Sequence, residues 1–464
     1  MPLRRVVLLL AVVATACAPG PNLTADADGR VDPTTTTTPP GESTTTTTTV
    51  PLDEPTLPTL PEIEPGPVDD APPGPVDPID GRAALQNRAV TIRADEEVID
   101  VATTGLPTQP TWSRDGERLV FLTNRNGVSA VVVTDPDGTV IAEQVATRPY
   151  FFFSWSHDGS RIAALGPGDE STTLDILDAD GAVLHTDVAE AQSLWIAWDP
   201  EALRIAVHAD ERLLRVDADG TTTDLGEVGL QFFAPKWIPG RNEILLVVDI
   251  EGTETLVRRG LDGGDTLFAL GSVETETSIV VNPDGRTAAL TILFDVEGGG
   301  GGVGERIALG PPLVQETPAR SGRVDIIDLD TGERVPVFTG HALWVEWNPD
   351  GDRLLLGTTD IAEGTGAWWV YEHDDPFADA AAEVEPTVTL AVASYVPTRV
   401  FLASYLVFAD QFVEQPRLWA PTGDQFIYTT DTTDGGWAMA AALDDLGRPD
   451  KIGPAAVAFW SPVG

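Results

Sequence analysis

The sequence predicts an all-β fold built from eight repeats of one four-stranded unit. In each repeat an apolar strand ends, a short turn follows, and a second apolar strand begins, as in Thr111-Trp112-Ser113-Arg114-Asp115-Gly116 followed by Leu119-Val120-Phe121. The residues that end the first strand, called anchors below, are Trp112, Trp155, Trp198, Trp237, Val281, Trp347, Trp419 and Trp460. Successive anchors are 43, 43, 39, 44, 66, 72 and 41 residues apart. A period of about 40–45 residues is that of one β-propeller blade.

A second turn recurs within the repeats and supports four strands per unit. Its clearest copies are Asp135-Pro136-Asp137-Gly138, Asp178-Ala179-Asp180-Gly181 and Asp217-Ala218-Asp219-Gly220. Asp-Gly pairs favour tight hairpins because glycine adopts the positive φ that these turns require. Each repeat therefore holds two hairpins, which make one four-stranded blade.

The combination of Trp-Ser-x-Asp-Gly, an apolar strand and Asp-x-Asp-Gly resembles the TolB-like, WD-repeat-like β-propellers of bacterial exported proteins. The resemblance covers roughly residues 105 to 464. It implies a propeller and an exported protein, but not a function, because propellers host unrelated sites. The small α/β domain of TolB has no counterpart before the repeats, so the resemblance is to the repeat rather than to the Tol system.

The first residues are typical of a lipoprotein signal peptide, assigned to residues 1–16. Arg4-Arg5 precede an apolar run from Val6 to Ala14, and small residues lead to Cys17. The run is too short to span a membrane. The position of Cys17 resembles a bacterial lipobox, although Ala14 stands where leucine is commoner. We expect a lipid on Cys17 that holds the protein on the outer face of the cell membrane; cleavage near an incidental cysteine is the alternative.

Residues 17–84 are predicted to be a disordered Thr/Pro-rich linker. Threonine tracts at 34–38 and 44–49 lie among prolines and acidic residues. Such a composition buries too little apolar surface to fold. The segment suits a tether, and its Thr and Pro content resembles O-glycosylated stalks.

Residues 85–464 are predicted to form a single propeller domain. Val90–Ile92 and Val98–Val101 are expected strands ahead of the first anchor, and Val457–Trp460 is an inner strand without a following partner. Pairing the two chain ends closes the ring and removes its exposed edges. We expect eight blades; seven is the alternative.

Two repeats carry insertions. The fifth has an excess around Gly298–Gly302, interpreted as a surface loop because no Gly-Lys-Ser/Thr follows the glycines. In the sixth, Asp375-Pro376-Phe377 predicts the start of a short helix. The apolar stretch from Val400 to Trp419 follows and is interpreted as a packed strand and crossing loop, with a ligand site as the other possibility.

Charge and residue types exclude several classes of protein. The formal net charge is −45, with lysine only at Lys236 and Lys451, so nucleic-acid binding, which needs basic patches, is not expected. The sequence lacks a Gly-x-Ser-x-Gly elbow and a His-Glu-x-x-His motif. No metal site, cofactor or catalytic residue is predicted. The five histidines lie apart, without ligand spacing: His157, His185, His208, His341 and His373.

Aromatic residues just upstream of the anchors mark a candidate ligand surface at one mouth of the central channel. Residues from the sixth-repeat insertion are expected beside them. The candidates are Phe152, Trp195, Phe233, Trp344, Tyr405, Phe408, Asp410 and Gln411. Packing between blades is the structural alternative for the same rings. We expect a non-enzymatic binding or scaffold module for an unknown protein, peptide or glycan; the alternative is a propeller enzyme, a glycan lyase or hydrolase, with its site at the channel.

Overall fold

The computed structural model describes residues 79–463, with gaps. The gaps are residues 80, 95–96, 102, 104, 229–233, 262–266, 273–276, 296–319, 361–363, 373–376, 378–386, 413–414, 416 and 447. The described residues belong to one compact unit, Glu62–Gly464. The predicted signal peptide, Cys17, nearly all of the linker, the glycine-rich insertion and most of the helix expected at 375–377 lie outside them.

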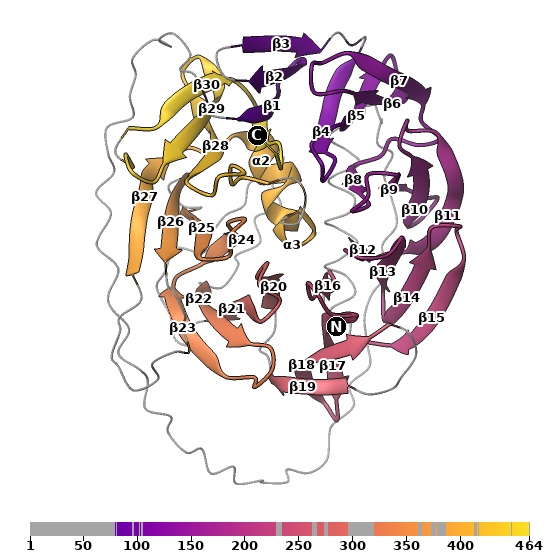
Figure 1. The fold of residues 1–464 in the computed structure, drawn as a ribbon, viewed down its shortest axis with the longest axis vertical. Helices are drawn as coiled ribbons and strands as arrows, with labels where there is room; N and C mark the ends of the chain where they lie inside the picture. The colour runs from indigo at the N-terminus through magenta and orange to yellow at the C-terminus, as the bar shows by residue number, and fades with distance from the viewer. Residues whose placement is uncertain are drawn as a thin grey trace, which may run out of the picture. The chain divides into compact units, whose positions relative to one another are not determined.

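The described chain forms a ring of eight antiparallel blades, as predicted (Figure 1). We number blades 1 to 7 by their anchors, Trp112 to Trp419. Blade 1 comprises β4 (Leu106–Trp112), β5 (Leu119–Arg125), β6 (Val128–Thr134) and β7 (Val140–Val145). Blade 2 comprises β8 (Phe152–Trp155), β9 (Arg161–Pro167), β10 (Thr172–Asp178) and β11 (Val183–Ala191). Blade 3 comprises β12 (Leu194–Trp198), β13 (Arg204–Ala209), β14 (Arg212–Asp217) and β15 (Thr222–Glu227).

The remaining blades repeat this order from the channel outwards. Blade 4 comprises β16 (Lys236–Trp237), β17 (Glu243–Ile250), β18 (Thr253–Gly260) and β19 (Leu267–Ser272). Blade 5 comprises β20 (Thr277–Val281), β21 (Thr287–Asp295), β22 (Arg320–Asp328) and β23 (Arg334–Thr339). Blade 6 comprises β24 (Ala342–Trp347), β25 (Arg353–Asp360), β26 (Thr365–Glu372) and β27 (Thr387–Tyr395). Blade 7 comprises β28 (Gln425–Thr432), β29 (Gly435–Ala442) and β30 (Asp450–Pro454), with an inner strand reduced to the bridge between Trp419 and Phe426.

The last blade joins the two ends of the chain. The C-terminal strand β31 (Val457–Trp460) pairs with β1 (Arg82–Gln86), which continues into β2 (Val90–Ala94) and β3 (Glu97–Val101). The two strands expected from sequence are β2 and β3. Strand β1 was not predicted, and it is the one that contacts the C-terminus. We call this unit the closing blade.

The position of each strand explains its residue pattern. The second strand of a blade is packed on both faces by neighbouring blades, so β5 is buried from Leu119 to Thr123. Such strands are continuous apolar runs rather than alternating ones. The outermost strand β7 is exposed along nearly all its length. The turns after the inner strands have the predicted geometry, with φ of +69° at Gly116 and +66° at Gly159.

Anchor tryptophans link most neighbouring blades by hydrogen bonds. In each case the indole Nε1 donates to the carbonyl oxygen of the residue before the previous anchor, at 3.0–3.1 Å. The five donors are Trp155, Trp198, Trp237, Trp347 and Trp419, and their acceptors are Thr111, Ser154, Ala197, Val280 and Glu346. We call this series the tryptophan ladder. It shows why the repeat carries tryptophan: the ring fills the space between blades and its N–H satisfies a buried carbonyl.

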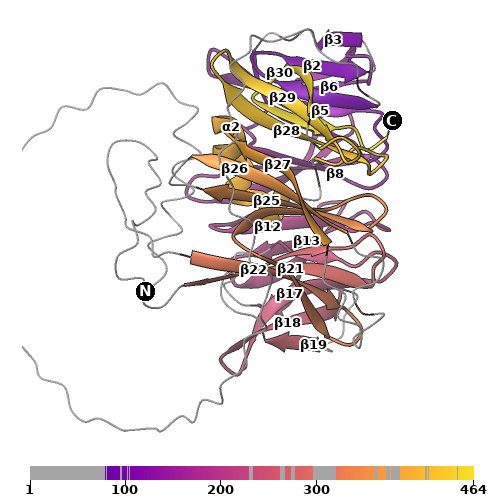
Figure 2. The same ribbon diagram turned by 90° about the vertical axis from the view of Figure 1, so that its left-hand side faces the viewer.

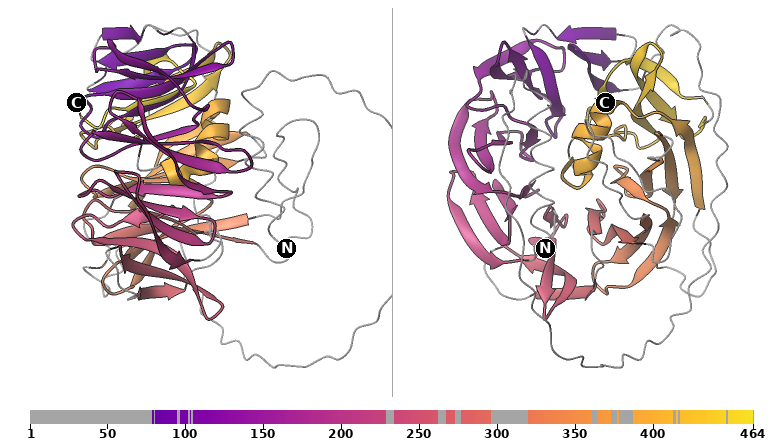
Figure 3. Two further views of the ribbon diagram at one scale, coloured as in Figure 1. Left: turned by 90° about the vertical axis from the view of Figure 1, so that its right-hand side faces the viewer. Right: turned by 180° about the vertical axis from the view of Figure 1, so that it is seen from behind.

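A helical insertion between blades 6 and 7 occupies the centre of the ring (Figures 1 and 3). It consists of α2 (Arg399–Ser404), η1 (Leu406–Phe408) and α3 (Ala409–Phe412). The interpretation of this stretch as a strand and crossing loop is therefore wrong for residues 399–412. Its apolar residues are spaced to bury a helical face against inner strands that surround it, a setting that the local sequence does not reveal. Figure 2 shows α2 at one face of the ring. We call residues 398–420 the plug.

Candidate functional site at the plugged channel

The plug hydrogen-bonds to the backbone edges of inner strands, which have a sheet neighbour on one side only. Gln411 pairs with Ile196 of β12 as a strand would, since its Oε1 accepts from Ile196 N at 2.9 Å and its Nε2 donates to Ile196 O at 2.8 Å. Gln415 Oε1 accepts from Trp155 N of β8 at 2.8 Å. Buried backbone groups that lack a partner are costly. The two glutamine side chains therefore hold the plug in place by hydrogen-bonding backbone groups of the inner strands. Without the plug, these groups would have only water as a partner.

Asp410 connects two further blades to the plug. Its Oδ2 accepts from Ala234 N at 2.6 Å, beside blade 4, and its Oδ1 accepts from Ser278 Oγ of β20 at 2.9 Å. Lys236, in β16, places Nζ 3.7 Å from Asp410 Oδ1 and also donates to Asp410 O. The lysine side chain is 2 % exposed and the aspartate 11 %. One of only two lysines in the chain thus neutralises the plug's carboxylate inside the ring.

The plug is contacted by residues that immediately precede the anchors in the inner strands. Ser154, Lys236 and Glu346 occupy that position in their blades, and each bonds to the plug. Glu346 is fully buried; its Oε2 accepts from Trp344 Nε1 at 3.0 Å, and its carboxylate also accepts from Leu418 N at 3.2 Å. Burial raises the pKa of Glu346 to about 7, against the hydrogen bonds and the nearby Arg417, which lower it.

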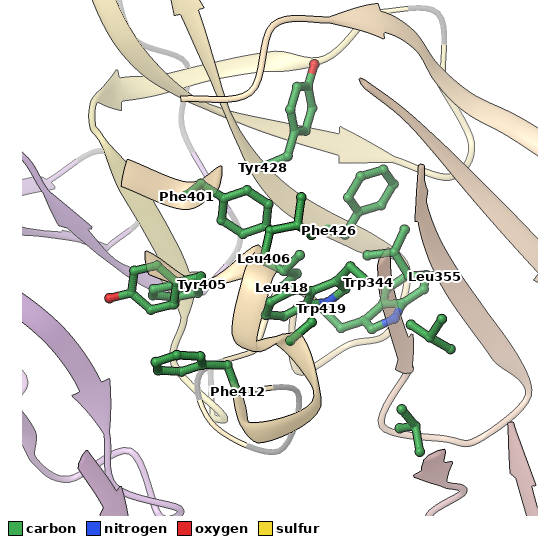
Figure 4. Packing of buried hydrophobic residues seen from close by; sticks show 14 of the residues in the cluster. Trp344, Leu355, Phe401, Tyr405, Leu406, Phe412, Leu418, Trp419, Phe426 and Tyr428 are labelled. Atoms are coloured by element: carbon green, nitrogen blue, oxygen red, sulfur yellow. The ribbon is translucent and has the colours of Figure 1, made fainter. Parts of the chain in front are cut away.

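Rings upstream of the anchors pack against the plug at the end of the channel where inner strands begin. Figure 4 shows one of them, Trp344, in a buried cluster with Phe401 and Phe412 of the plug. Trp344 lies 5.5 Å from Phe401, and Phe152 lies 5.1 Å from Phe412, between ring centroids. Tyr405 contacts Phe412 at 4.7 Å and Phe459 of the closing blade at 5.0 Å. We call this end of the channel the aromatic mouth.

The predicted candidates separate into two groups by exposure. Phe152, Trp344, Tyr405 and Gln411 are buried, and Asp410 is nearly so. Trp195 and Phe408 are half-buried and lie 6.5 Å apart between ring centroids. Val407, next to Phe408, is 52 % exposed. The structure thus gathers these seven candidates around the plug, but only Trp195 and Phe408 present a ring to solvent; Phe233 lies outside the described residues.

Sequence reasoning missed Lys236, Glu346 and Gln415, which bond the plug to the ring. The sequence holds a signal for Lys236 and Glu346, which directly precede anchors. Side chains alternate along a strand, so a residue before an anchor points away from the side on which the anchor's indole is buried. Gln415 carries no such signal, because its partner Trp155 is 260 residues away.

Two features are absent from the described part of the chain. There, no group of three or more His, Cys, Asp or Glu side chains is arranged to hold a metal ion. Within the same residues, no helix has the length and apolar character needed to cross a membrane.

Comparisons with known proteins identify the fold. No protein-family model matches the sequence, and no curated protein is similar to it. The chain is similar to a solved structure of a eukaryotic initiation factor, with a TM-score of 0.51 and 11% identity over 83% of this chain and 99% of the other. An oligogalacturonate lyase in complex with manganese has a TM-score of 0.48 and 14% identity over 80% of this chain and 100% of the other. TolB from Acinetobacter baumannii has a TM-score of 0.35 and 15% identity over 63% of this chain and 61% of the other.

These identities are low enough that the likeness concerns the fold alone, and the three matched proteins are named for unrelated roles. The ring of eight blades agrees with the spacing of the anchors in the sequence. The chain is an eight-bladed β-propeller, with TolB proteins among its structural neighbours.

Proposed function

We propose that the protein is an exported, lipid-anchored propeller that binds a protein, peptide or glycan at the aromatic mouth without catalysing a reaction. The observation that carries the proposal is the exposed edge of the plug, where Trp195 and Phe408 meet beside Val407. Aromatic residues supply large contact area and stack on sugars or peptides. Here the backbone beneath them is fixed by Gln411 and Asp410, so binding would order few additional groups.

The second candidate, a propeller enzyme working from the channel, has less support. A catalytic site there would need side chains that face a substrate, whereas Ser154, Lys236 and Glu346 already bond to the plug. The oligogalacturonate lyase similarity concerns the fold and does not favour this candidate.

Site-specific photo-crosslinking in producing cells tests the binding proposal. A photoreactive residue at Val407 is compared with one at Ile141 in the outermost strand β7, which has a similar exposed fraction of 44 % against 52 %. For a protein ligand, we expect a crosslinked adduct at position 407 and none at position 141. For a glycan ligand, we expect the purified protein to retain envelope polysaccharide and Trp195→Ala to abolish the retention. Equal labelling at both positions with no retention, or release of oligosaccharides from that polysaccharide, contradicts the proposal.

Lipid anchoring through Cys17 is proposed from the sequence alone. Cells expressing wild type and Cys17→Ser are fed a labelled fatty acid and then fractionated. We expect label only in the wild type, and the serine variant in the soluble fraction. Absence of label from both proteins, together with unchanged fractionation of the variant, excludes the anchor.

A further inference from the structure

A groove lies between blade 7 and the closing blade, where the strand that faces the closing blade is short. The outermost strand of blade 7, β30, has five residues, whereas the outermost strands of blades 1 to 6 have six to nine. One face of β1, β2 and β3 is therefore only partly covered. The groove has a volume of about 340 Å³, which lies at the lower end of the range for small-molecule sites. We call it the closing-blade groove.

The strand registers place one wall of this groove on a single face of the closing blade. Leu85, Thr91 and Asp100 are cross-strand neighbours in β1, β2 and β3. In the adjacent row of the same face, Arg93 of β2 lies opposite Val98 of β3. Side chains that are directly opposite in this way have Cβ atoms about 4.5–5.5 Å apart. The five side chains all line the groove, so they form one continuous surface.

The apolar part of the groove includes an exposed valine. Val98 is 52 % exposed although it lines the groove. Leu85 and Ile452 are buried in the same lining, and Pro454 is exposed at the end of β30. Covering the exposed valine with the carbon chain of a ligand would remove apolar surface from water, which favours binding.

Two arginines give the groove a positive charge in a chain with a net charge of −45. Arg93 is 1 % exposed and donates through Nη1 to Glu97 O at 3.3 Å. Arg88 is exposed in the turn between β1 and β2. Among the described lining residues Asp100 is the single carboxylate, and it accepts from Thr91 Oγ1 at 3.3 Å. The Glu97 side chain lies on the opposite face of β3, because strand side chains alternate. The described lining thus has two cationic side chains against one anionic side chain.

We propose that the closing-blade groove binds an aliphatic carboxylate, with the carbon chain along Val98 and the carboxylate at Arg88. Arginine presents a planar fork of donors that matches a carboxylate. Arg93, which is held by its bond to Glu97 O, adds positive potential beneath the ligand. A fatty acid and the C-terminal residue of a peptide both offer this chemistry. The inference goes beyond the proposed function, since it concerns a groove between two blades and a different ligand.

Exposed positions supply variants that should keep the fold. Arg88→Gln removes the guanidinium at the groove, and Arg125→Gln is its matched control at an exposed arginine of β5 in blade 1. Val98→Glu places a carboxylate in the groove, and Leu106→Glu makes the same kind of change in β4, at a residue that is 63 % exposed. Thermal melting of each variant verifies that it is folded.

Isothermal titration with octanoate and with acetyl-leucyl-leucine, which has a free carboxylate, tests the proposal. The titrations use the full chain with Cys17→Ser, which lacks the proposed lipid attachment and needs no detergent. We expect saturable one-to-one binding of at least one carboxylate, about fivefold tighter than binding of the neutral analogue octanamide. The tighter of the two carboxylates distinguishes a fatty acid from a peptide C-terminus.

The variants locate the bound carboxylate. Arg88→Gln should weaken binding about fivefold, as expected for loss of one exposed ion pair. Val98→Glu should weaken it at least about tenfold, because like charges in one site repel each other. Arg125→Gln and Leu106→Glu should leave the dissociation constant unchanged.

Three results would overturn the inference. The first is an absence of saturable binding at carboxylate concentrations up to about 10 mM, which covers dissociation constants into the millimolar range. The second is equal binding of octanoate and octanamide, which would mean that the groove does not recognise the carboxylate. The third is equal binding by the Arg88→Gln and Val98→Glu variants and their parent, which would place the ligand elsewhere. These results do not bear on crosslinking at Val407, so this inference and the proposed function can fail separately.

Discussion

The blades joined by the tryptophan ladder and the seam at the closing blade hold the ring together by different means. Around the ring, Trp155, Trp198, Trp237, Trp347 and Trp419 each donate to the preceding blade. At the seam, Trp112 and Trp460 are as deeply buried, yet their Nε1 atoms have no partner among the described residues. The repeat motif is present at the seam, but its hydrogen bond is not.

The plug makes contacts at the seam that the ladder does not. Arg417 O accepts from Trp460 N, Tyr405 packs on Phe459, and Thr398 Oγ1 donates to Ala456 O. At the same place, β31 pairs with β1, so the first and last strands of the ring belong to one blade. The comparison indicates that bonds between consecutive repeats stabilise most of the ring, whereas contacts between distant parts of the chain stabilise its closure.

The largest expected effect is loss of the seam. Deleting residues 82–101 removes β1 to β3 and, with them, buried side chains such as Leu85, Val90 and Ile92. At about 1.5–3 kcal/mol for each buried side chain, the loss is comparable with the whole stability of a domain. We expect no cooperative unfolding transition by circular dichroism. The exposed control Val145→Ala, in β7, should change the free energy of unfolding by less than about 0.5 kcal/mol; a deletion variant that melts like wild type would show that the chain ends do not close the ring.

Replacing the aromatic residues around the plug by alanine should destabilise the fold in proportion to how deeply each ring is buried. Trp344 is fully buried against Phe401, so Trp344→Ala should cost about 3–5 kcal/mol in chemical denaturation. Trp195→Ala should cost clearly less, because Trp195 is only half-buried. Equal losses of several kcal/mol in both variants would make Trp195 a core residue and remove it from the proposed binding surface.

Glu346 tests the seating of the plug through pH. Its folded pKa, about 7, exceeds the ordinary value of 4.5. The protonated Glu346 therefore contributes fully to the free energy of unfolding below pH 4.5. This contribution is lost as the pH rises to about 7, a change on the order of 3 kcal/mol. The free energy of unfolding of Glu346→Gln relative to wild type should thus improve by that order between pH 4.5 and 8. A difference that does not vary with pH would mean that Glu346 is ionised in the folded protein throughout this range.

The smallest effect isolates one ladder bond. Trp198 and Trp460 are equally buried anchors, but Trp198 donates through Nε1, whereas Trp460 Nε1 has no partner among the described residues. Replacement by phenylalanine removes similar apolar area from each, so Trp198→Phe should cost about 1 kcal/mol more than Trp460→Phe. Thermal or denaturant unfolding of both variants measures the difference. A larger loss in Trp460→Phe would show that the seam depends on its indole more than the ladder blades do on theirs.

Much of the ring could be predicted because its signals are local and repeated. The Asp-Gly turns, the period near 43 residues and the unpartnered strand Val457–Trp460 each depend on neighbours in the chain, and together they predicted eight blades and their closure. Strand β1 was missed because Arg82–Gln86 follows the linker directly and carries no turn signal of its own.

The candidate site shows what local patterns cannot reach. In the sequence, Phe152, Trp344 and Trp195 all occupy the same kind of position, a few residues before an anchor. Packing against the plug makes Phe152 and Trp344 buried and leaves Trp195 partly exposed. Helices α2 and α3 likewise lie in an apolar stretch whose conformation is decided by the inner strands around it.

The sequence by itself determined the blade and the position of each anchor, and it favoured eight copies over seven. Tertiary structure decided which carboxylate pairs with Lys236 and which inner-strand edges the plug satisfies. The physical reason is the distance over which each property is set. Strands and turns follow from backbone preferences over a few residues, whereas burial and charge pairing depend on groups brought together from hundreds of residues apart.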